Sequence, residues 1–453
     1  MSTYRPRLST EARAQALQAA RSLRAQKTDI AASAPITPSP DFASLAGYKE
    51  RKTIRQVMPA LGIRDPYFRQ HEMRGGSHSR IAGKDVLNFG SYDYLGLNAD
   101  PRPAAAAKAA IDRYGVSASG SRLTSGDRPV HRALEAALAR HYDVEDALCF
   151  VSGHATNISV IATLLGKDDL MLHDAHIHNS SFVGATLSGA SRRSFAHNDM
   201  DALEQLLIDT AGQHRATLVC VEGHYSMDGD VPDLERLVAL KRKYGFWLMV
   251  DEAHGLGCIG PTGKGVREIC DIAGSEVDIW MGTLSKALGS TGGYIAGSSV
   301  LIDILKHEAP GHVYSVALAP ALAAAAETAL SILEAEPERV QRLQALGRLF
   351  VDCAKAQGLD VGTGVGASII PVMIGNSALA VAASNMLLEA GINVLPVTFP
   401  GVPMNEARLR FFISSLHHED EIRHAVATTA AVLRDLRETR PDLQLDASTG
   451  PPP

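Results

Sequence analysis

The sequence predicts an α/β fold, with a large, mostly parallel sheet domain followed by a smaller C-terminal α/β domain. From about residue 100 to residue 330, helical segments alternate with short apolar ones. Near-continuous apolar runs separated by helices are typical of parallel strands that are buried on both faces of a sheet. The runs that we predict as strands are Ala147–Val151, Leu170–Leu172, Thr217–Val221, Phe246–Val250 and Val277–Trp280.

The changes in composition along the chain predict five parts. We expect a flexible N-terminal appendage and Pro/Ser/Ala-rich linker at 1–40, an N-terminal segment at 41–98, the large domain at 99–330, the small domain at 331–440 and a disordered tail at 441–453. The remaining elements that we predict are helices at Phe42–Met58, Ser331–Leu349 and Ala378–Leu388, a hairpin at Arg80–Phe89, and strands at Ile369–Ile374 and Leu409–Ile413.

Composition excludes several classes of function. The chain has 453 residues, 45% of them hydrophobic, and a formal net charge of -6, so nothing in its charge favours binding to nucleic acid. Its five cysteines are scattered without a CxxC spacing, which favours a reducing cytoplasm over a disulfide framework or a zinc site. The longest uncharged stretch, Val361 to Leu388, is interrupted by glycines and a proline, so we expect no membrane span.

The most informative motif is Thr283-Leu-Ser-Lys286-Ala-Leu-Gly289, which follows a predicted strand. A lysine amine attacks an aldehyde only where its pKa lies below the solution value of roughly 10.4. Small neighbours leave room around the lysine stem, and the hydroxyls of Thr283 and Ser285 are suited to bind a phosphate. The motif therefore predicts a Schiff-base lysine for pyridoxal phosphate, and its alternative is a solvated lysine in a Gly/Ser loop.

A second motif, Asp251-Glu-Ala-His254, follows another predicted strand. The carboxylate of Asp251 is suited to keep a pyridinium nitrogen protonated, and His254 to bind the ring oxygen, although a helix N-cap is an alternative role for Asp251. The letters DEAH alone do not indicate a helicase, because the chain has no GxxxxGK[ST] loop. The nearby match to GxGxxG, Gly255 to Gly260, is followed by Pro261 and more glycines, which disfavour the helix that a dinucleotide needs.

Two further motifs follow predicted strands. Ser152-Gly153-His154 begins a predicted helix, whose backbone N–H groups and dipole favour a phosphate. His173, His176 and His178 suggest a metal, but their spacing fits no zinc signature, so we predict no metal and expect a ring stacked on a flat cofactor. Ligands bind outside the carboxyl ends of parallel strands, so Ser226, Asp251 and Lys286 should converge at one edge of the sheet.

Together these motifs resemble those of the α-oxoamine synthases, a family of fold-type-I, aspartate aminotransferase-like pyridoxal phosphate enzymes. The resemblance extends from about Gly47 to Leu436. It is carried by seven blocks in family order, namely Ser91-Tyr-Asp-Tyr-Leu-Gly-Leu97, Ser152-Gly-His-Ala-Thr-Asn157, Glu222-Gly-His-Tyr-Ser-Met-Asp-Gly-Asp230, Asp251-Glu-Ala-His-Gly255, Gly282-Thr-Leu-Ser-Lys-Ala-Leu-Gly289, Tyr314-Ser-Val-Ala-Leu-Ala-Pro320 and Ala407-Arg-Leu-Arg410.

The resemblance implies a role for each matched residue. It implies that Lys286 holds the cofactor, that Asp251 pairs with the pyridinium nitrogen and that His178 stacks on the ring. The other cofactor-binding residues that it implies are Ser152, Gly153, His154, Ala155, Ser226, His254, Thr283, Ser285 and Ser315, the last of which reaches over from the second subunit of a homodimer. The implied substrate-binding residues are Arg410, which grips the amino-acid carboxylate, and Asp93.

The implied reaction joins an amino acid to an acyl thioester with loss of carbon dioxide and gives an α-amino ketone. Serine, alanine and glycine all stay open as the amino acid. This chain departs from its relatives at three positions. Relatives often have Asn in place of Asp93, an aromatic residue in place of His154 and a hydroxyl-bearing residue in place of Val316. Some of these motifs are most similar to those of α-oxoamine synthase domains that are attached to polyketide synthases. This similarity favours an acyl carrier protein as the acyl donor, with coenzyme A as the alternative. An aminotransferase or decarboxylase of the same fold and a non-catalytic partner subunit are the competing functions.

Overall fold

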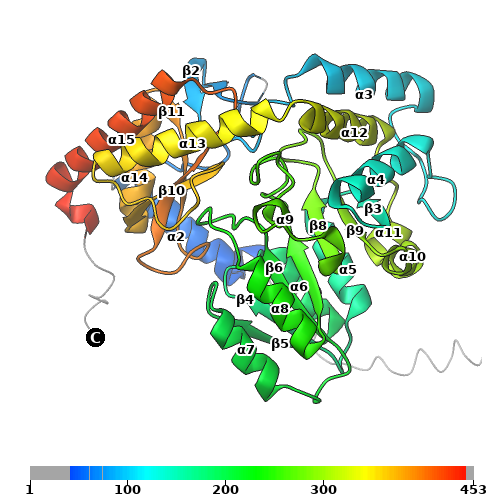
Figure 1. Cartoon of the computed structure of the whole chain (residues 1–453). Coiled ribbons are helices and arrows are strands. Elements are labelled where there is room, and N and C mark those ends of the chain that lie inside the picture. The colour runs from blue at the N-terminus through cyan, green and yellow to red at the C-terminus, as the bar shows by residue number, and fades with distance from the viewer. Residues whose placement is uncertain (1–40, 61, 74, 445–453) are drawn as a thin grey trace, which may run out of the picture. The chain divides into compact units, whose positions relative to one another are not determined.

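The computed structural model describes residues 41–60, 62–73 and 75–444, and these divide into two compact units at Gly62. The first unit contains η1 (Phe42–Ser44) and α2 (Ala46–Ala60), close to the predicted helix. The second contains everything from Ile63 onward (Figure 1). The predicted appendage at 1–40 lies outside the described residues, as does most of the predicted tail. Within the described ranges, no helix is both long and apolar enough to cross a membrane.

A seven-stranded sheet forms the centre of the second unit (Figure 1). All its neighbours pair in parallel except β9, which runs antiparallel to both β3 and β8. Only residues 284–292 connect β8 to β9, and a parallel crossover needs a dozen or more residues, so this connection must reverse the chain. The strands, in spatial order, are β3 (Asp146–Phe150), β9 (Gly293–Gly297), β8 (Ile279–Thr283), β7 (Trp247–Asp251), β6 (Thr217–Glu222), β4 (Leu170–Asp174) and β5 (Ser191–Phe195).

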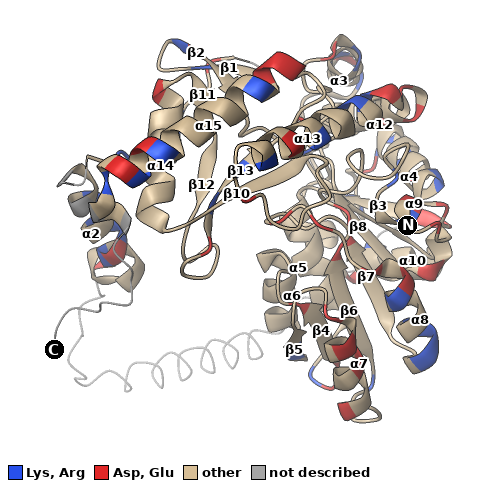
Figure 2. Ribbon diagram, turned by 60° about the vertical axis from the view of Figure 1, so that its left-hand side comes forward, with Lys and Arg blue, Asp and Glu red and all other residues tan. Residues whose placement is uncertain are grey.

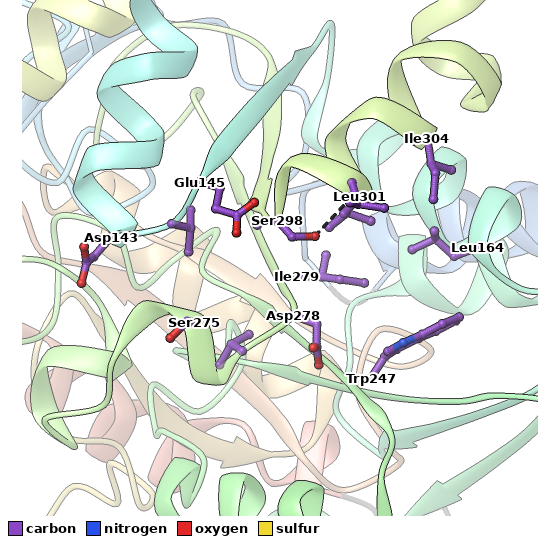
Figure 3. Close-up of a pocket in the computed structure, with 14 residues that line it drawn as sticks. Asp143, Glu145, Leu164, Trp247, Ser275, Asp278, Ile279, Ser298, Leu301 and Ile304 are labelled. Carbon is purple, nitrogen blue, oxygen red and sulfur yellow. Dashed lines mark hydrogen bonds between the residues drawn. The ribbon is translucent and has the colours of Figure 1, made fainter.

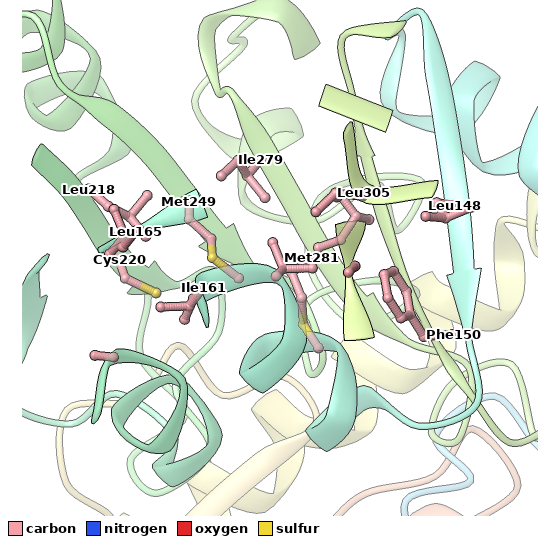
Figure 4. Packing of buried hydrophobic residues seen from close by; sticks show 14 of the residues in the cluster. Leu148, Phe150, Ile161, Leu165, Leu218, Cys220, Met249, Ile279, Met281 and Leu305 are labelled. Carbon is pink, nitrogen blue, oxygen red and sulfur yellow. The ribbon is translucent and has the colours of Figure 1, made fainter. Parts of the chain in front are cut away.

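One face of this sheet packs against α5, α6 and α10 and forms a buried apolar core (Figure 4). Ile161 of α5 and Leu305 of α10 pack over Met249 and Met281 of the central strands. On the other face, Tyr142 at the end of α4 stacks on Trp280 of β8. The helices of this part are α3 (Pro101–Tyr114), α4 (Pro129–Tyr142), α5 (Gly153–Leu164), α6 (Asn179–Ser188), α7 (Met200–Asp209), α8 (Leu234–Tyr244), α9 (Val266–Ile269), α10 (Ser299–Glu308), α11 (Pro310–Val313) and α12 (Pro320–Ala335), with the 3-10 turn η2 (Gly274–Glu276).

The C-terminal part contains two small sheets, one of which includes strands from the N-terminal segment. Basic and acidic residues are interspersed along α13 and α15 (Figure 2). Because β2 pairs with both β1 and β11, residues 78–88 and 392–393 belong to one sheet, and we propose that the smaller domain includes both segments. Its elements are β1 (His78–Ile81), β2 (Lys84–Asn88), α13 (Glu338–Ala356), β10 (Ile369–Gly375), α14 (Ser377–Glu389), β11 (Ile392–Asn393), β12 (Leu395–Val397), β13 (Ala407–Phe412), α15 (Glu419–Thr439) and η3 (Pro441–Gln444).

The predicted fold class is confirmed, and three local predictions are wrong. The single helix expected at 331–349 is two helices, because α12 ends at Ala335 and Pro337 precedes α13. Proline has no N–H to donate and disfavours helical backbone in the residue before it, here Glu336. Strand β8 begins at Ile279, two residues after the predicted start. Residues Pro441–Gln444, which we assigned to the tail, form η3.

Candidate active site

Three neighbouring strands of the large sheet end at one cavity. Strand β6 ends at Glu222, β7 at Asp251 and β8 at Thr283, and the loop after β8 carries Lys286. The cavity has a volume of about 430 Å³ and is lined by all of these residues, as well as by Arg410 of β13. The convergence of Ser226, Asp251 and Lys286 that the parallel sheet predicts is therefore observed.

Lys286 presents its amine inside this cavity. The side chain is half-buried, and its Nζ lies 5.7 Å from the centroid of the Tyr92 ring. Burial lowers the pKa of Lys286 to about 8, although the nearby Asp251 and Glu222 carboxylates act in the opposite direction. Near neutral pH a fraction of the amine is consequently unprotonated, which a nucleophile or a base requires.

Asp251 is buried and is held by two hydrogen bonds. Its Oδ1 accepts from the backbone N–H of Ala253 at 2.9 Å, and its Oδ2 accepts from Asn157 Nδ2 at 2.8 Å. The same Asn157 nitrogen donates to Ser180 Oγ at 2.9 Å, and Ser180 Oγ lies 2.6 Å from Nδ1 of His178. One chain of hydrogen bonds thus fixes both Asp251 and the imidazole that we expect to stack on a cofactor ring.

Glu222 brings a second buried carboxyl group to the cavity. Burial, followed by the neighbouring Asp251, raises the pKa of Glu222 to about 8. Its Oε2 accepts from the backbone N–H of Ser226 at 3.0 Å, and its Oε1 has no hydrogen-bond partner among the described residues. Near neutral pH Glu222 is therefore largely protonated and places little additional negative charge beside Asp251.

Arg410 enters the cavity from the smaller sheet. Its Nη1 donates to the backbone oxygen of Ser226 at 2.8 Å, its guanidinium lies 4.7 Å from the Phe412 ring centroid, and its buried Nε has no partner among the described residues. A guanidinium that is oriented in this way and only partly hydrogen-bonded is suited to bind a carboxylate. The structure therefore combines groups from the seven-stranded sheet and from the small sheet that contains β13 in one site.

His254 lies at the same edge of the sheet. Its Nδ1 lies 2.7 Å from the hydroxyl of Tyr94, and burial, reinforced by the positive charges of Lys286 and Arg410, holds the pKa of His254 well below its usual value. Burial raises the pKa of Tyr94 well above 10, so its hydroxyl keeps its proton. With Tyr94 donating to Nδ1, the neutral imidazole has an Nε2–H donor left.

The N-terminus of α5 and the end of β8 form a cradle of donors. Ser152 is the N-cap of α5, and the N–H groups of Gly153 and His154, in the first turn, have no acceptor within the helix. A side chain at position 153 would lie only 3.0 Å from Thr283 Oγ1, so glycine permits this close approach. Together with Ser285, these donors fit a phosphate, and with Lys286 and Asp251 the set fits pyridoxal phosphate.

Three of the predicted site residues lie outside this cavity. Ala155 uses its N–H to donate to Ser152 Oγ at 3.3 Å. Ser315 is half-buried, and its hydroxyl donates to the neighbouring Val316 oxygen. Asp93 lines an adjoining cavity of about 360 Å³, to which Lys286 also contributes.

Several residues that line the cavity have no individual role among those predicted from the sequence. Asn157, Ser180, Glu222 and Tyr92 are all among them. Asn157 and Glu222 belong to motif blocks that the resemblance covers, and Glu222 is the last residue of a strand, which was the available signal. The contact between Asn157 and Asp251 joins residues 94 positions apart, so no local pattern predicts it.

A larger cavity, of about 650 Å³, lies toward the opposite ends of the strands (Figure 3). It is lined mainly by apolar side chains, including Trp247, Ile279 and Leu301, and it contains none of the predicted site residues. We therefore assign the candidate site to the cavity around Lys286, where the titratable groups converge.

The chain is similar to known proteins over most of its length. Residues 84–428 match the model of the family described as aminotransferase class I and II. The chain is 40% identical to an 8-amino-7-oxononanoate synthase of Methylobacterium nodulans over 86% of its own length and 96% of that enzyme. It superposes on the serine palmitoyltransferase of Sphingomonas wittichii with a TM-score of 0.84 and 31% identity, covering 88% of this chain and 100% of that one. A structure of the same kind of enzyme with PLP gives a TM-score of 0.84 at 30% identity.

The chain belongs to the aminotransferase class I and II family, with the fold-type-I architecture of its pyridoxal phosphate enzymes. Within that family it is an α-oxoamine synthase, an acyltransferase that uses pyridoxal phosphate to join an amino acid to an acyl thioester with loss of carbon dioxide.

Proposed function

We propose that the amino acid is small, namely serine, alanine or glycine, and that the acyl group arrives on an acyl carrier protein or on coenzyme A. The observation that supports the site is the meeting of Lys286, Asp251 and Arg410 at one cavity of about 430 Å³. A lysine with a lowered pKa, a fixed carboxylate and an incompletely bonded guanidinium are the groups that this condensation needs.

The residues of this chain would hold the cofactor at four points. Asp251, fixed by Asn157, would face the ring nitrogen, and His254 would donate its Nε2–H to the ring oxygen. His178 would cover one face of the ring, and Thr283, Ser285 and the first turn of α5 would bind the phosphate. When bound, pyridoxal phosphate supplies an aldehyde for an amine and a ring that accepts the electron pair left on carbon as a bond to it breaks.

Lys286 would act in two ways. Its unprotonated amine would hold the cofactor, and Nζ would take the proton from Cα of the bound amino acid. Burial lowers the pKa of Lys286 to about 8, so the amine exchanges protons readily near neutral pH. The largely protonated Glu222 would limit the negative charge around Asp251.

Arg410 would bind the carboxylate of the amino acid. Its Nη1 already donates to the Ser226 oxygen, which fixes the guanidinium, and its Nε is free to donate. A small amino acid leaves the rest of the cavity to the thioester carbonyl that the new carbon–carbon bond must reach.

We also propose a homodimer in which Ser315 of the second subunit completes the phosphate site. An exposed apolar patch supports this proposal: it comprises Val116, Leu123, Tyr314 and Val316, of which Tyr314 is 86% exposed. The two segments that form the patch are joined by the hydrogen bond from Ala317 N to the Gly120 oxygen, at 3.0 Å. Exposed apolar patches are typical of interfaces.

The five cysteines form no disulfide, which supports our proposal of a cytoplasmic location.

Thiol release tests the proposed substrates. Each of the three amino acids is incubated with the pyridoxal phosphate-loaded enzyme and an acyl-coenzyme A or an acyl carrier protein, and free thiol and carbon dioxide are measured. We expect both products in equal amounts with at least one pair. Carbon dioxide without thiol would favour a decarboxylase, amino transfer to a keto acid would favour an aminotransferase, and a protein inactive with every pair would favour the role of a non-catalytic partner subunit.

A further inference from the structure

A cluster of charged side chains lies next to the candidate site. His197, in the turn between β5 and α7, places its ring between two carboxylates: Nδ1 lies 2.8 Å from Asp174 Oδ1 and Nε2 lies 2.8 Å from Asp230 Oδ2. The next residue, Asn198, bonds the same pair, since its N–H donates to Asp174 Oδ2 at 2.9 Å and its Nδ2 to Asp230 Oδ2 at 2.8 Å. Two consecutive residues thus join the end of β4 to the loop after β6.

The His197 ring is protonated at neutral pH. Both of its nitrogens face carboxylates, and the two hydrogen bonds outweigh burial and raise the pKa of His197 to about 10. The ring of His176 stacks on it with centroids 4.0 Å apart and planes 16° from parallel, and the Tyr225 ring meets it edge-on at 4.5 Å.

The same geometry disfavours a metal ion. His176, His197 and Asp228 each have a ligand atom within 4.8 Å of the others. An imidazole binds a metal in the plane of its ring, and two rings stacked face to face cannot both direct their lone pairs at one ion. A metal at His197 would also have to replace one of the two protons that bond the carboxylates.

A path of contacts connects His197 to Arg410. His176, which stacks on His197, has its Nδ1 3.2 Å from Asp228 Oδ2. Asp228 forms an ion pair with the buried Arg408 of β13, two residues before Arg410 on the same strand. The loop from Tyr225 to Asp230 also contains Ser226, whose oxygen accepts the hydrogen bond from Arg410.

We propose that His197 is a positioning residue, which holds the loop from Tyr225 to Asp230 and, through His176, Asp228 and Arg408, sets the place of Arg410 for the amino-acid carboxylate. This inference rests on the proposed role of Arg410. His197 itself does not line the cavity, so it acts through other residues and touches no reacting atom. It should therefore affect the affinity for the amino acid more than the rate of the reaction.

The first test replaces His197 by Gln, whose amide donates to only one of the two carboxylates. Glycine, L-alanine and L-serine are titrated into the pyridoxal phosphate-loaded protein and followed by cofactor absorbance, and pyridoxal phosphate is titrated into the apoprotein. For the preferred amino acid we expect Kd and KM to rise about 10-fold, with kcat and the cofactor Kd changing less than about threefold. The control is His307→Gln on α10, an exposed histidine outside the cavity, which should leave all four constants unchanged.

The second test is a double-mutant cycle with Arg408→Lys. If His197 acts through Asp228 and Arg408, the double variant should lose little more amino-acid affinity than the more affected single variant. Additive losses would overturn this path, as would equal loss of amino-acid and cofactor affinity in His197→Gln. If His197→Gln does not fold, Asp230→Asn removes one charge while keeping the side-chain shape, and it should give a smaller effect in the same direction. An unchanged amino-acid Kd in Asp230→Asn would then overturn the proposal.

Arg410→Gln separates this inference from the proposed function. Unchanged amino-acid affinity in Arg410→Gln would end the proposed carboxylate role and the inference with it. Weaker affinity in Arg410→Gln, together with a His197→Gln protein that behaves like His307→Gln, would overturn the inference alone.

Discussion

Two cavities at opposite ends of the same sheet differ in what their polar groups do. The cavity around Lys286, of about 430 Å³, is smaller than the cavity beside Trp247, of about 650 Å³ (Figure 3). In the larger one, Glu145 accepts from the backbone and hydroxyl of Ser299, and Asp278 pairs with Lys241. In the smaller one, several buried polar atoms have no partner within the described part of the chain, and this difference marks the functional site better than size does.

The difference has an energetic meaning. A buried polar atom without a partner costs about 1–3 kcal/mol. Around Lys286, the atoms without partners among the described residues include Asn157 Oδ1, Glu222 Oε1 and Arg410 Nε. Such atoms are tolerated where a ligand completes their hydrogen bonds. The polar groups around Lys286 therefore fit ligand binding, whereas those of the larger cavity stabilise the fold.

The largest expected effect follows from comparing Lys286, which lines the smaller cavity, with Lys241, which pairs with Asp278 of the larger one. We expect Lys286→Ala to lower kcat by about 10³-fold or more, because the same amine holds the cofactor and moves the proton. Its counterpart Lys241→Ala, which breaks the pair with Asp278, should leave kcat unchanged and lower the free energy of unfolding by less than about 1 kcal/mol. Thiol release and urea denaturation measure the two quantities. Normal turnover by Lys286→Ala would contradict the assigned site.

The next effect compares one carboxylate at each cavity. Asp251→Asn removes the charge that would face the ring nitrogen, and we expect kcat to fall about 10²-fold or more. Asp278→Asn, at the other cavity, should leave catalysis unchanged, since its oxygen serves Leu248 N and Lys241. Steady-state kinetics at saturating cofactor separate the two variants, and similar losses in both would remove the distinction between the cavities.

Much of this arrangement could be predicted from the sequence, because each strand end carries its own local signal. Apolar runs placed β6 and β7, and the residues that follow them placed Asp251 at the edge of the sheet. Strand β5 gave no such signal: its Ser191-Arg-Arg-Ser stretch is exposed at the sheet edge, where charged side chains replace the apolar pattern.

The contacts between distant residues could not be predicted. Asn157 reaches Asp251, and Arg410 reaches Ser226, only after helices, strands and two sheets have packed together. His197 illustrates the same limit, since the two carboxylates that it contacts lie at the end of β4 and in the loop after β6. A motif shows which groups are present, whereas packing decides which groups face a ligand and which face each other.

A smaller effect should appear in the pH dependence of cofactor binding. The pKa of Lys286 is lowered to about 8, so the amine is an ammonium below that pH and a nucleophile above it. The rate at which the apoprotein binds pyridoxal phosphate covalently should therefore rise through about pH 8 and then level off. In Glu222→Gln the midpoint should move to lower pH, because the Glu222 anion raises the pKa of the lysine. Stopped-flow absorbance measures the rate, with Lys286→Ala giving the background from surface lysines.

The smallest effect on catalysis should come from substituting Trp247, a residue that lines the larger cavity. Trp247 is 38% exposed and lines that cavity with Leu164, Ile279 and Ile304 (Figure 3). Replacing it by Ala removes part of an apolar contact area, so we expect the free energy of unfolding to fall by about 1–2 kcal/mol. The amino-acid Kd and kcat should stay within error of the unmodified protein, because Trp247 is the first residue of β7 and Asp251 is the last. A changed amino-acid Kd in Trp247→Ala, with the fold intact by circular dichroism, would show that the two ends of β7 are coupled and would reassign the larger cavity to function.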